Sequence, residues 1–362
     1  MTQKFDLEEY LTKGAEKIVK EALSVSRMNA KETMFFLKFA AAAKAAAKKR
    51  RRAEEQGEHI PSFLITSITS RCNLHCAGCY SRCTEATKDE KPADQLTAAE
   101  WLRVFQEAEE LGISFILLAG GEPLLRRDVL TAAASVKNIL FPVFTNGTFV
   151  DDRIFSLFSE NRNLLPVLSM EGGRAQTDAR RGKGVFDRLM ACMKGLRERR
   201  IFFGVSVTVT RENAERVTSD AFVSALERRG CKAVFYIEYV PMDEETRDLA
   251  PDDAMREEMS QAMDRIRADH EGMMVISFPG DEKKSGGCLA AGRGFIHINS
   301  QGGAEPCPFS PYSDVNVRNT SLRNALRSPL FRKLASRGLL TENHIGGCVL
   351  FEQREEVEQL LQ

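Results

Sequence analysis

Three cysteines fall within one short run of this chain, Cys72-Asn-Leu-His-Cys76-Ala-Gly-Cys79. The run has the spacing C-x₃-C-x₂-C and follows an apolar, β-rich stretch at residues 63–69, so we expect it on a loop after a strand. Three thiolates this close together can bind three irons of a cubic [4Fe–4S] cluster and leave the fourth iron open to another ligand. Zinc is the alternative metal, although structural zinc sites usually close all four positions with C-x₂-C pairs.

Strand-like and helical segments alternate in the middle of the chain. The β-rich runs lie at residues 63–69, 113–119, 141–145, 164–169, 202–210 and 233–240. Amphipathic stretches fill the gaps at residues 98–111, 127–137, 151–159, 185–199, 214–229 and 251–269. This alternation predicts an α/β fold in which a parallel sheet has helices outside it. In such folds ligands bind beyond the carboxyl ends of the strands, so chemical motifs should follow strands.

Helical and glycine-rich segments flank this region. Asp6 can cap a first helix that runs to Ile18, and a second helix is expected over about residues 30–55. The second helix ends in the basic run Lys48–Arg52, which is either a solvated helix end, where cations are favoured, or a patch for an anionic partner. After about residue 275 the chain turns glycine-rich and carries its last three cysteines. We therefore predict an N-terminal helical extension (1–58), a main α/β domain (59–274) and a small C-terminal domain (275–362).

The composition argues against several classes of protein. The 362 residues carry 51 basic and 51 acidic side chains, so net charge gives no reason to expect nucleic acid as a partner. No apolar run is long enough to span a membrane, and the polar N-terminus lacks the apolar region of a secretory signal. Nine clustered cysteines suit metal ligation better than disulfides, which predicts a reducing cytoplasm. An iron–sulfur cluster would also indicate a host compartment low in oxygen, that is, an anaerobic setting.

Polar and glycine-rich motifs follow the predicted strands. The second strand ends in Gly120-Gly121-Glu122-Pro123, where glycines let the backbone approach a ligand closely. The third strand ends in Thr145-Asn146-Gly147, and the fourth ends in Ser169-Met170-Glu171. Together with the cysteine run, these motifs resemble those of the radical S-adenosylmethionine (radical SAM) family. The resemblance covers about residues 63–350.

The resemblance implies a fold and a chemistry. The fold is a partial (β/α)₆ barrel, and the open iron of the cluster chelates the amino and carboxylate groups of SAM. An electron from the cluster then cleaves SAM to a 5′-deoxyadenosyl radical, which abstracts hydrogen from a substrate. A reductant protein of the flavodoxin or ferredoxin type is the partner that this chemistry implies.

The resemblance also assigns residues that bind the cofactor. Gly120, Gly121, Glu122 and Pro123 form the GGEP motif that binds the amino group of SAM, and Asn146 belongs to a turn often found beside the cluster. Ser169 and Glu171 are expected near the SAM ribose, with Glu171 standing where the family usually has Asp.

Two further positions are assigned in the same way. Arg181 is expected to pair with the SAM carboxylate, with Arg180 as the competing candidate. The family often has an aromatic residue just before the third cysteine, where this chain has Gly78. Tyr80, which follows Cys79, is therefore expected to shield the cluster or to contact adenine.

A second set of cysteines lies near the C-terminus, at Cys288, Cys307 and Cys348. The residues from Phe295 to Cys307 read as a hairpin that leads into a ligand, with His297 expected to pack rather than to react. The spacing Gly302-x₄-Cys307 resembles the SPASM and twitch extensions of the family, which carry auxiliary iron–sulfur clusters. We therefore predict one auxiliary cluster, with a structural zinc or free buried thiols as alternatives. The candidate fourth ligands are His344, Cys231, Cys192 and Cys83, or no protein ligand at all.

The predicted function is that of a radical SAM enzyme, an oxidoreductase whose substrate the sequence does not name. A peptide or protein side chain is favoured, and a cofactor precursor or small metabolite is the alternative. An iron–sulfur electron carrier or redox sensor is the competing class, although such proteins seldom need an open iron and six βα units. No residue that reacts with the substrate is assigned.

Overall fold

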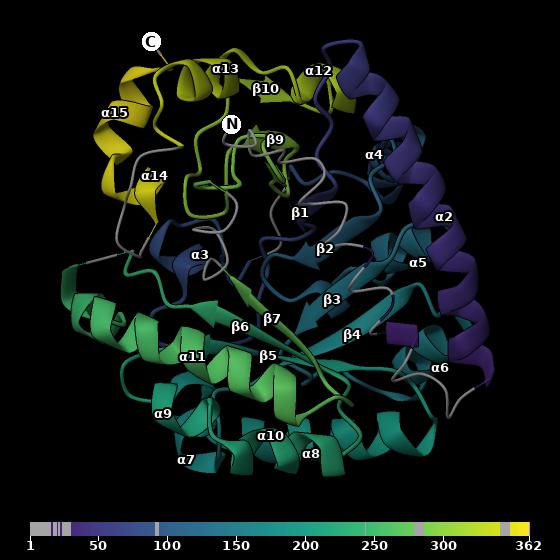
Figure 1. Cartoon of the computed structure of the whole chain (residues 1–362), viewed down its shortest axis with the longest axis vertical. Helices are drawn as coiled ribbons and strands as arrows, with labels where there is room; N and C mark the ends of the chain where they lie inside the picture. Colours follow the sequence, from purple (N-terminus) through teal and green to yellow (C-terminus); the bar gives the residue numbers. More distant parts are fainter. Residues whose placement is uncertain are drawn as a thin grey trace, which may run out of the picture.

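One continuous sheet organises the protein in the computed structural model (Figure 1), which describes residues 16, 20, 22–23, 30–90, 94–242, 244–278, 286–340 and 348–361. The ten strands lie in the order β10-β9-β8-β1-β2-β3-β4-β5-β6-β7. The parallel strands are β1 (Phe63–Ser67), β2 (Phe115–Ala119), β3 (Phe141–Thr145), β4 (Leu164–Ser169), β5 (Gly204–Val209), β6 (Ala233–Glu238) and β7 (Met274–Phe278). The C-terminal strands are β8 (His297–Ile298), β9 (Gly303–Glu305) and β10 (Val315–Asn316).

Helices connect the parallel strands and cover the outer face of the sheet (Figure 1). They are α4 (Ala98–Leu111), α5 (Arg127–Ser135), α6 (Asp152–Glu160), α7 (Arg174–Arg181), α8 (Val185–Glu198), α9 (Ala214–Val217), α10 (Asp220–Arg228) and α11 (Asp253–Asp269). Shorter elements are α3 (Tyr80–Cys83) and the 3-10 turns η1 (Pro123–Leu125) and η2 (Glu244–Leu249). The helix α2 (Ala30–Glu55) precedes the sheet, and α12 (Leu322–Ala325), α13 (Pro329–Ser336), α14 (Val349–Glu352) and α15 (Arg354–Gln359) follow it.

The six predicted strands are confirmed, and the expected α/β fold with a parallel sheet is correct. The strand β7 adds a seventh parallel strand beside β6. It crosses the predicted junction between the second and third domains at residues 274–275. Beyond it, β8 pairs in parallel with β1, so the C-terminal segment continues the same sheet. The predicted division into domains stays a prediction.

Most of the predicted helices are also confirmed, and one is divided. The stretch expected as a single helix over residues 214–229 forms α9 and α10, because Ser219 caps a new helix by accepting a hydrogen bond from the Phe222 amide. The predicted helix from Asp6 to Ile18 lies outside the described residues, apart from Glu16. In the basic run, Arg50 is buried and donates to the Gly112 carbonyl, while Arg51 and Arg52 are exposed as a solvated helix end requires.

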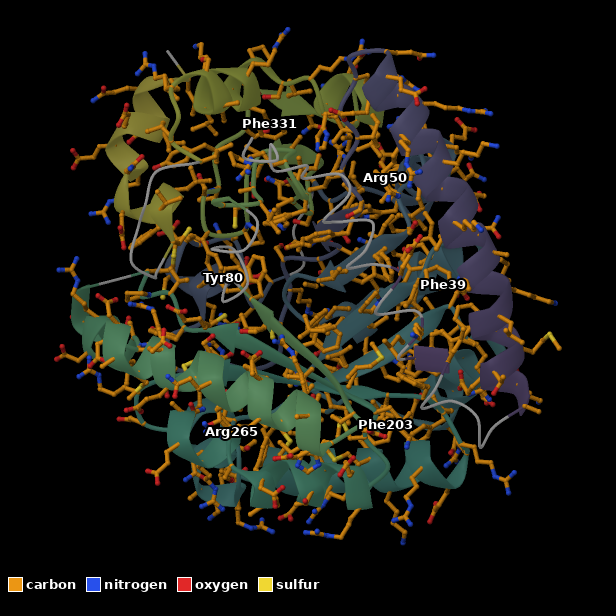
Figure 2. All side chains as sticks on the ribbon, viewed as in Figure 1. Phe39, Arg50, Tyr80, Phe203, Arg265 and Phe331 are labelled. Carbon is orange, nitrogen blue, oxygen red and sulfur yellow. The ribbon has the colours of Figure 1, made fainter. Side chains whose placement is uncertain are left out.

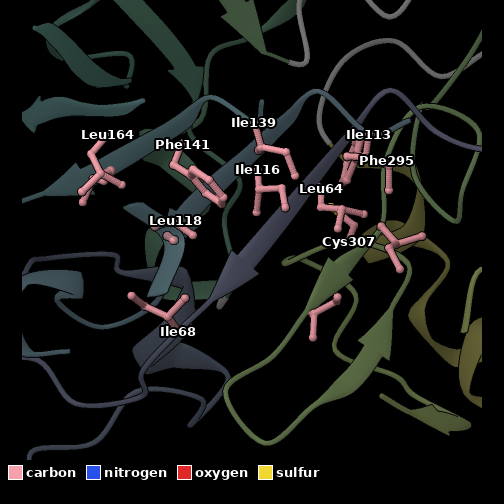
Figure 3. Packing of buried hydrophobic residues seen from close by; sticks show 14 of the residues in the cluster. Leu64, Ile68, Ile113, Ile116, Leu118, Ile139, Phe141, Leu164, Phe295 and Cys307 are labelled. Atoms are coloured by element: carbon pink, nitrogen blue, oxygen red, sulfur yellow. The ribbon is translucent and has the colours of Figure 1, made fainter. Parts of the chain in front are cut away.

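The sheet alternates side chains between two faces, as strand geometry requires. Leu64, Ile116, Leu118 and Phe141 pack against the outer helices, and Figure 3 shows this layer continuing to Phe295 and Cys307. The other face, which carries Phe63 and Ile65, encloses a cavity.

The helix α2 lies across the amino ends of the strands. Its Phe36 and Phe39 are fully buried, and their rings contact Phe202 and Phe115 at centroid distances of 5.1 and 5.4 Å. The same apolar cluster includes Leu165 at the start of β4. The cavity therefore has a closed apolar floor at one end of the barrel, and Figure 2 shows Phe39 on the sheet side of α2.

The helices of the described residues were compared with the length and apolar character that a membrane span requires, and none of them meets both requirements.

Candidate active site

The three clustered cysteines lie on the loop between β1 and α3, at the carboxyl end of the sheet as predicted. The Cys79 amide donates to the Cys76 carbonyl at 3.2 Å, and Cys79 then starts the short helix α3. The loop is held from the other side, where the Ala77 amide donates to the Arg180 carbonyl at 2.8 Å. All three cysteines line one cavity, so the structure brings the predicted ligand set to a single mouth.

That cavity has a volume of about 770 Å³ and runs down the inside of the barrel. Its upper wall contains residues from the predicted cofactor motifs, namely Tyr80, Gly120, Gly121, Glu122, Asn146, Ser169 and Arg181. Its lower wall is aromatic and aliphatic, and includes Phe115, Phe144 and Phe235. Polar groups therefore surround the cysteines, while the deeper part is apolar.

The three thiols can bind a metal only after they lose their protons. Burial raises the pKa of the Cys72 thiol to about 11, so a metal must displace its proton. All three thiols line one cavity. The residues present therefore fit a [4Fe–4S] cluster that is bound through three thiolates.

The two glycines after β2 let the cysteine loop approach the sheet. A Cβ atom on Gly120 would lie 2.3 Å from the Thr69 carbonyl oxygen, and one on Gly121 would lie 2.1 Å from that of Arg71. The Gly121 amide donates to Thr69 at 2.7 Å, and the Glu122 amide donates to Arg71 at 2.8 Å. The sequence predicted that these glycines admit a ligand, and the structure adds that they admit the loop that bears the cysteines.

Glu122 is a buried acid in the cavity wall. Its carboxylate accepts from the Thr145 hydroxyl at 2.6 Å and from the Leu124 and Asn146 amides at 3.0 and 2.8 Å. Burial raises the pKa of Glu122, and these hydrogen bonds act in the opposite direction. A carboxylate held in this way can attract a cationic group such as an amine. Pro123, also predicted for the site, is buried in η1 and positions Glu122 without lining the cavity.

The turn at Thr145–Gly147 connects Glu122 to the cysteine loop. Asn146 donates through Nδ2 to the side-chain oxygen of Asn73 at 3.0 Å, and Asn73 lies between the first two cysteines. Asn73 in turn donates to the Thr148 hydroxyl at 2.8 Å. The turn therefore fixes the cysteine loop from the side, next to the predicted cluster.

Glu171 organises two arginines rather than facing the cavity. Its Oε1 accepts from Arg180 at 2.6 Å and from Arg181 at 2.5 Å, and its Oε2 accepts from the Thr208 amide at 3.1 Å. Both arginines line the cavity. Arg181 lies 4.0 Å from the Cys76 sulfur, whereas Arg180 donates to the Ala77 carbonyl at 3.1 Å. Arg181 is thus the arginine nearer the predicted cluster.

The space beside Gly78 is filled from another strand. A Cβ atom on Gly78 would lie 2.3 Å from the hydroxyl oxygen of Tyr239, which follows β6 and lines the cavity. The aromatic residue expected from the resemblance at position 78 is therefore supplied by Tyr239. Sequence analysis did not assign this side chain.

Tyr80 is the first residue of α3 and lies near both sets of cysteines, since it interacts with Cys79 of the first set and Cys307 of the second. Burial raises the pKa of its phenol, and the charges of Cys79, Cys307 and Glu305 act in the same direction. Its ring meets that of Phe309 at 5.0 Å in an edge-on arrangement. Phe309 was not predicted, but its place two residues after Cys307 is the signal that could have indicated it.

The second set of cysteines is gathered in the C-terminal segment. The predicted hairpin is present as β8 and β9, and it delivers Cys307. Burial raises the pKa of Cys307, and its hydrogen bond with Cys348 and the charge of Cys288 raise it further. Three thiols far apart in the chain therefore lie near one another, as an auxiliary site requires.

The candidate fourth ligands of the auxiliary cluster lie in different parts of the protein. Cys192 and Cys231 are buried in the hydrophobic core, and burial raises the pKa of each thiol to about 12. Cys83 is exposed at the end of α3. His344 lies outside the described residues. The two buried thiols behave as small core residues.

Comparison with known proteins agrees with this geometry. The family model of the Radical SAM superfamily matches residues 66–221. The AdoMet-dependent heme synthase of Methanosarcina barkeri is 27% identical over 300 residues, which cover 76% of this chain and 84% of that protein. The PqqA peptide cyclase of Granulibacter bethesdensis is 24% identical over 258 residues, which cover 68% of this chain and 67% of the relative.

Solved structures share the fold. SuiB of Streptococcus suis bound to S-adenosylmethionine has a TM-score of 0.67 at 18% identity, covering 86% of this chain and 79% of SuiB. SuiB bound to its precursor peptide SuiA has a TM-score of 0.64 at 17% identity, covering 84% of this chain and 72% of SuiB. Residues 66–221 contain the cysteine loop and the ends of strands β2 to β4, and they form a radical SAM domain.

Proposed function

We propose that this enzyme cleaves S-adenosylmethionine reductively at a [4Fe–4S] cluster held by Cys72, Cys76 and Cys79, and abstracts hydrogen from a substrate in the barrel cavity. The observation that carries the proposal is the convergence of these three thiols with the GGEP segment and Arg181 on one cavity mouth. When bound, the cluster supplies the electron and SAM supplies the radical.

Different residues of the upper wall are proposed to bind different parts of SAM. Glu122 offers a buried negative charge for the amino group, and Arg181 offers a guanidinium for the carboxylate. Asn146 keeps the cysteine loop in place through Asn73. Ser169 lines the same cavity and is proposed to lie near the ribose, and its hydroxyl lies 3.1 Å from that of Ser206.

The lower wall supports a substrate with a sizeable apolar part. Phe115, Phe144 and Phe235 line it, and α2 closes its floor. We infer that the apolar part of the substrate enters the barrel. The carbon that loses hydrogen then lies at the cysteine end of the cavity. A peptide or protein side chain fits this arrangement, and the peptide relatives named above support it.

A cofactor precursor is the second candidate, because the heme synthase relative is matched over most of its length. The two classes differ in a direct assay. A true substrate accelerates the formation of 5′-deoxyadenosine. When the substrate is deuterated at the reacting carbon, the deuterium appears in the 5′-deoxyadenosine. Candidate peptides and iron porphyrins should be compared in this assay with flavodoxin or ferredoxin as the reductant.

The core of the proposal is tested by removing the three thiols. The variant Cys72→Ala/Cys76→Ala/Cys79→Ala should bind about four fewer irons after anaerobic reconstitution and form 5′-deoxyadenosine only at background level. Cys83→Ala is the matched control, because Cys83 lies on the adjoining helix α3 and is exposed. SAM cleavage by the triple variant at the rate of the control would overturn the proposal.

A further inference from the structure

Arg267 is a charged side chain of the substrate cavity that the proposed function does not use. It lies in the last turn of α11, the helix that leads from the carboxyl end of β6 back to the start of β7. Its side chain is 24% exposed and lines the cavity. A cation therefore faces the space in which the substrate is proposed to bind.

The strand register places Arg267 far from the cysteines. Its Nε donates to the carbonyl of Val275, the second residue of β7, at 3.4 Å. Val275 pairs with Val234 near the start of β6, and Tyr239 follows Val234 by five residues. Tyr239 stands beside Gly78 in the cysteine loop. At 3.3 Å per residue, Arg267 lies about 16 Å from the cysteine loop along the sheet.

The other charged residues in the described part of the lining gather at the cysteine end. They lie on α3 and α7 or at the carboxyl ends of strands, and they are Arg82, Glu122, Arg180, Arg181 and Glu238. Two of them are proposed above to bind SAM. At the level of Arg267, by contrast, the lining residues on β6 and β7 are apolar, namely Phe235, Met274 and Ile276. The charge of Arg267 thus stands apart from the SAM site.

The guanidinium of Arg267 lies between solvent and the cavity. On the solvent side, its Nη1 lies 3.2 Å from a carboxylate oxygen of Asp264, whose side chain is 64% exposed. An ion pair with so exposed a partner is weak, because water screens it. The planar fork of an arginine can bind two carboxylates at once. An anion that enters the cavity would therefore gain a strong, charge-assisted contact beside apolar walls.

We propose that Arg267 binds a carboxylate of the substrate at the end of the cavity remote from the cluster. This inference rests on the proposed function, because it places the substrate in that cavity. The apolar part of the substrate then lies between Arg267 and the SAM end, and the bound carboxylate determines which carbon meets the radical. The carboxylate and that carbon are no more than about 16 Å apart.

The substrate is therefore an apolar molecule with an acidic end. A peptide supplies this chemistry through an acidic side chain or a free C-terminus beside apolar residues. A porphyrin supplies it through propionate groups. The carboxylate is common to both candidate classes, so the site can be tested before the substrate is known.

Two probes that differ only in charge test the site. Pyrenebutyrate has an aromatic body and a carboxylate, and pyrenebutyramide has the same shape without the charge. Equilibrium dialysis against the full-length, reconstituted protein with SAM gives both dissociation constants. The wild type should bind the acid about tenfold or more tightly than the amide, as expected for charge-assisted hydrogen bonds.

Variants of α11 assign this preference to one side chain. Arg267→Gln should reduce the preference to about twofold or less, whereas Arg267→Lys should keep part of it, because a point charge replaces the fork. Arg265→Gln is the matched control, since Arg265 lies on the same helix and is exposed outside the lining. It should keep the full preference. A role for Arg267 in packing alone predicts equal weakening of both probes.

Two further measurements locate the probe and identify the source of the carboxylate. Leu117 lines the cavity from β2, so Leu117→Trp should weaken binding of both probes by about fivefold or more. Pyrenebutyrate bound to the wild type is then challenged with a short apolar peptide that has a free C-terminus, and with a porphyrin that has propionate groups. The compound that displaces it names the substrate class.

Three results would each overturn the carboxylate site. They are failure of both probes to bind the wild type, equal affinities for acid and amide, and an acid preference that survives Arg267→Gln. None of these measurements depends on SAM cleavage. Loss of the acid preference therefore counts against this site, and SAM cleavage without the three thiols counts against the proposed function.

Discussion

At the residue scale, two glycines control how the cysteine loop meets the sheet. Gly120 has a φ of +124°, and any side chain there would collide with the backbone of Thr69. Gly121 has an ordinary φ but stands equally close to Arg71. Neither contact can be relieved by rotating a side chain, because the obstructing atoms are backbone carbonyl oxygens. These two glycines therefore set the distance between the sheet and the loop that carries Cys72.

Gly120→Ala should release the cysteine loop from the sheet. The added Cβ forces the loop outward and separates Cys72 from its partners, so iron retained at this site should fall by more than half. Left-handed backbone strain at Ala should also cost about 1 kcal/mol of unfolding free energy. Iron content after reconstitution and urea unfolding measure the two effects.

Gly57→Ala is the control for that prediction. Gly57 also has a positive φ, +77°, but a Cβ there would meet nothing within 4 Å. It should show the loss of stability without the loss of iron. An equal iron content in the wild type and in Gly120→Ala would contradict this prediction, because it would show that the loop tolerates displacement.

At the element scale, the sequence indicated six parallel strands but not which strands are neighbours in the sheet. Alternation of β-rich and amphipathic segments located β1 to β6, because burial on both faces leaves short apolar runs. The apolar run that forms β7 lies at the predicted junction with the C-terminal domain, so the sequence analysis did not assign it to the sheet. The contact between Ser67 and His297 spans 230 residues, and no local pattern reports such a pair.

The helices also contain a contact that should depend on pH. His270, which ends α11, binds Glu227 at 2.8 Å and Asp220 at 2.9 Å, both on α10. Burial by itself lowers the pKa of His270, but the hydrogen bonds and charges of the two acids hold it above its ordinary value. A raised pKa means that the imidazolium stabilises the fold below the unfolded value of about 6.5, and that this contribution is lost as pH rises through the folded pKa.

His270→Gln should therefore lower stability more at pH 6 than at pH 9. The difference should be up to about 1 kcal/mol, because Asp220 is largely exposed and solvent screens its charge. Urea unfolding at the two pH values measures it. Glu227→Gln should reproduce the pH dependence by removing the partner, and the same loss at both pH values would contradict the ion pair.

At the scale of the whole molecule, the C-terminal segment joins the barrel instead of standing apart from it. Strand β8 pairs with β1, the strand that leads to the first cysteine set. Strand β9 then leads to Cys307, whose neighbours are Cys288 and Cys348. Tyr80 lies near both sets. Pro308 and Phe309, which follow Cys307, line the same cavity as the first set, whereas the three cysteines of the second set do not.

Removing the second set should separate its role from that of the first. In Cys288→Ala/Cys307→Ala/Cys348→Ala, iron should fall by about four per chain, one cube's worth, while SAM cleavage at the first set continues. Substrate turnover should stop, and the unfolding midpoint should drop because a metal that binds only the folded state stabilises it. The control is Cys83→Ala/Cys192→Ala/Cys231→Ala, which removes as many thiols outside either set and should keep its iron. Unchanged iron content in the first variant would contradict an auxiliary iron–sulfur cluster and leave the three thiols as buried core residues. Zinc in place of iron in the wild type would also contradict it and would make the three thiols a zinc site.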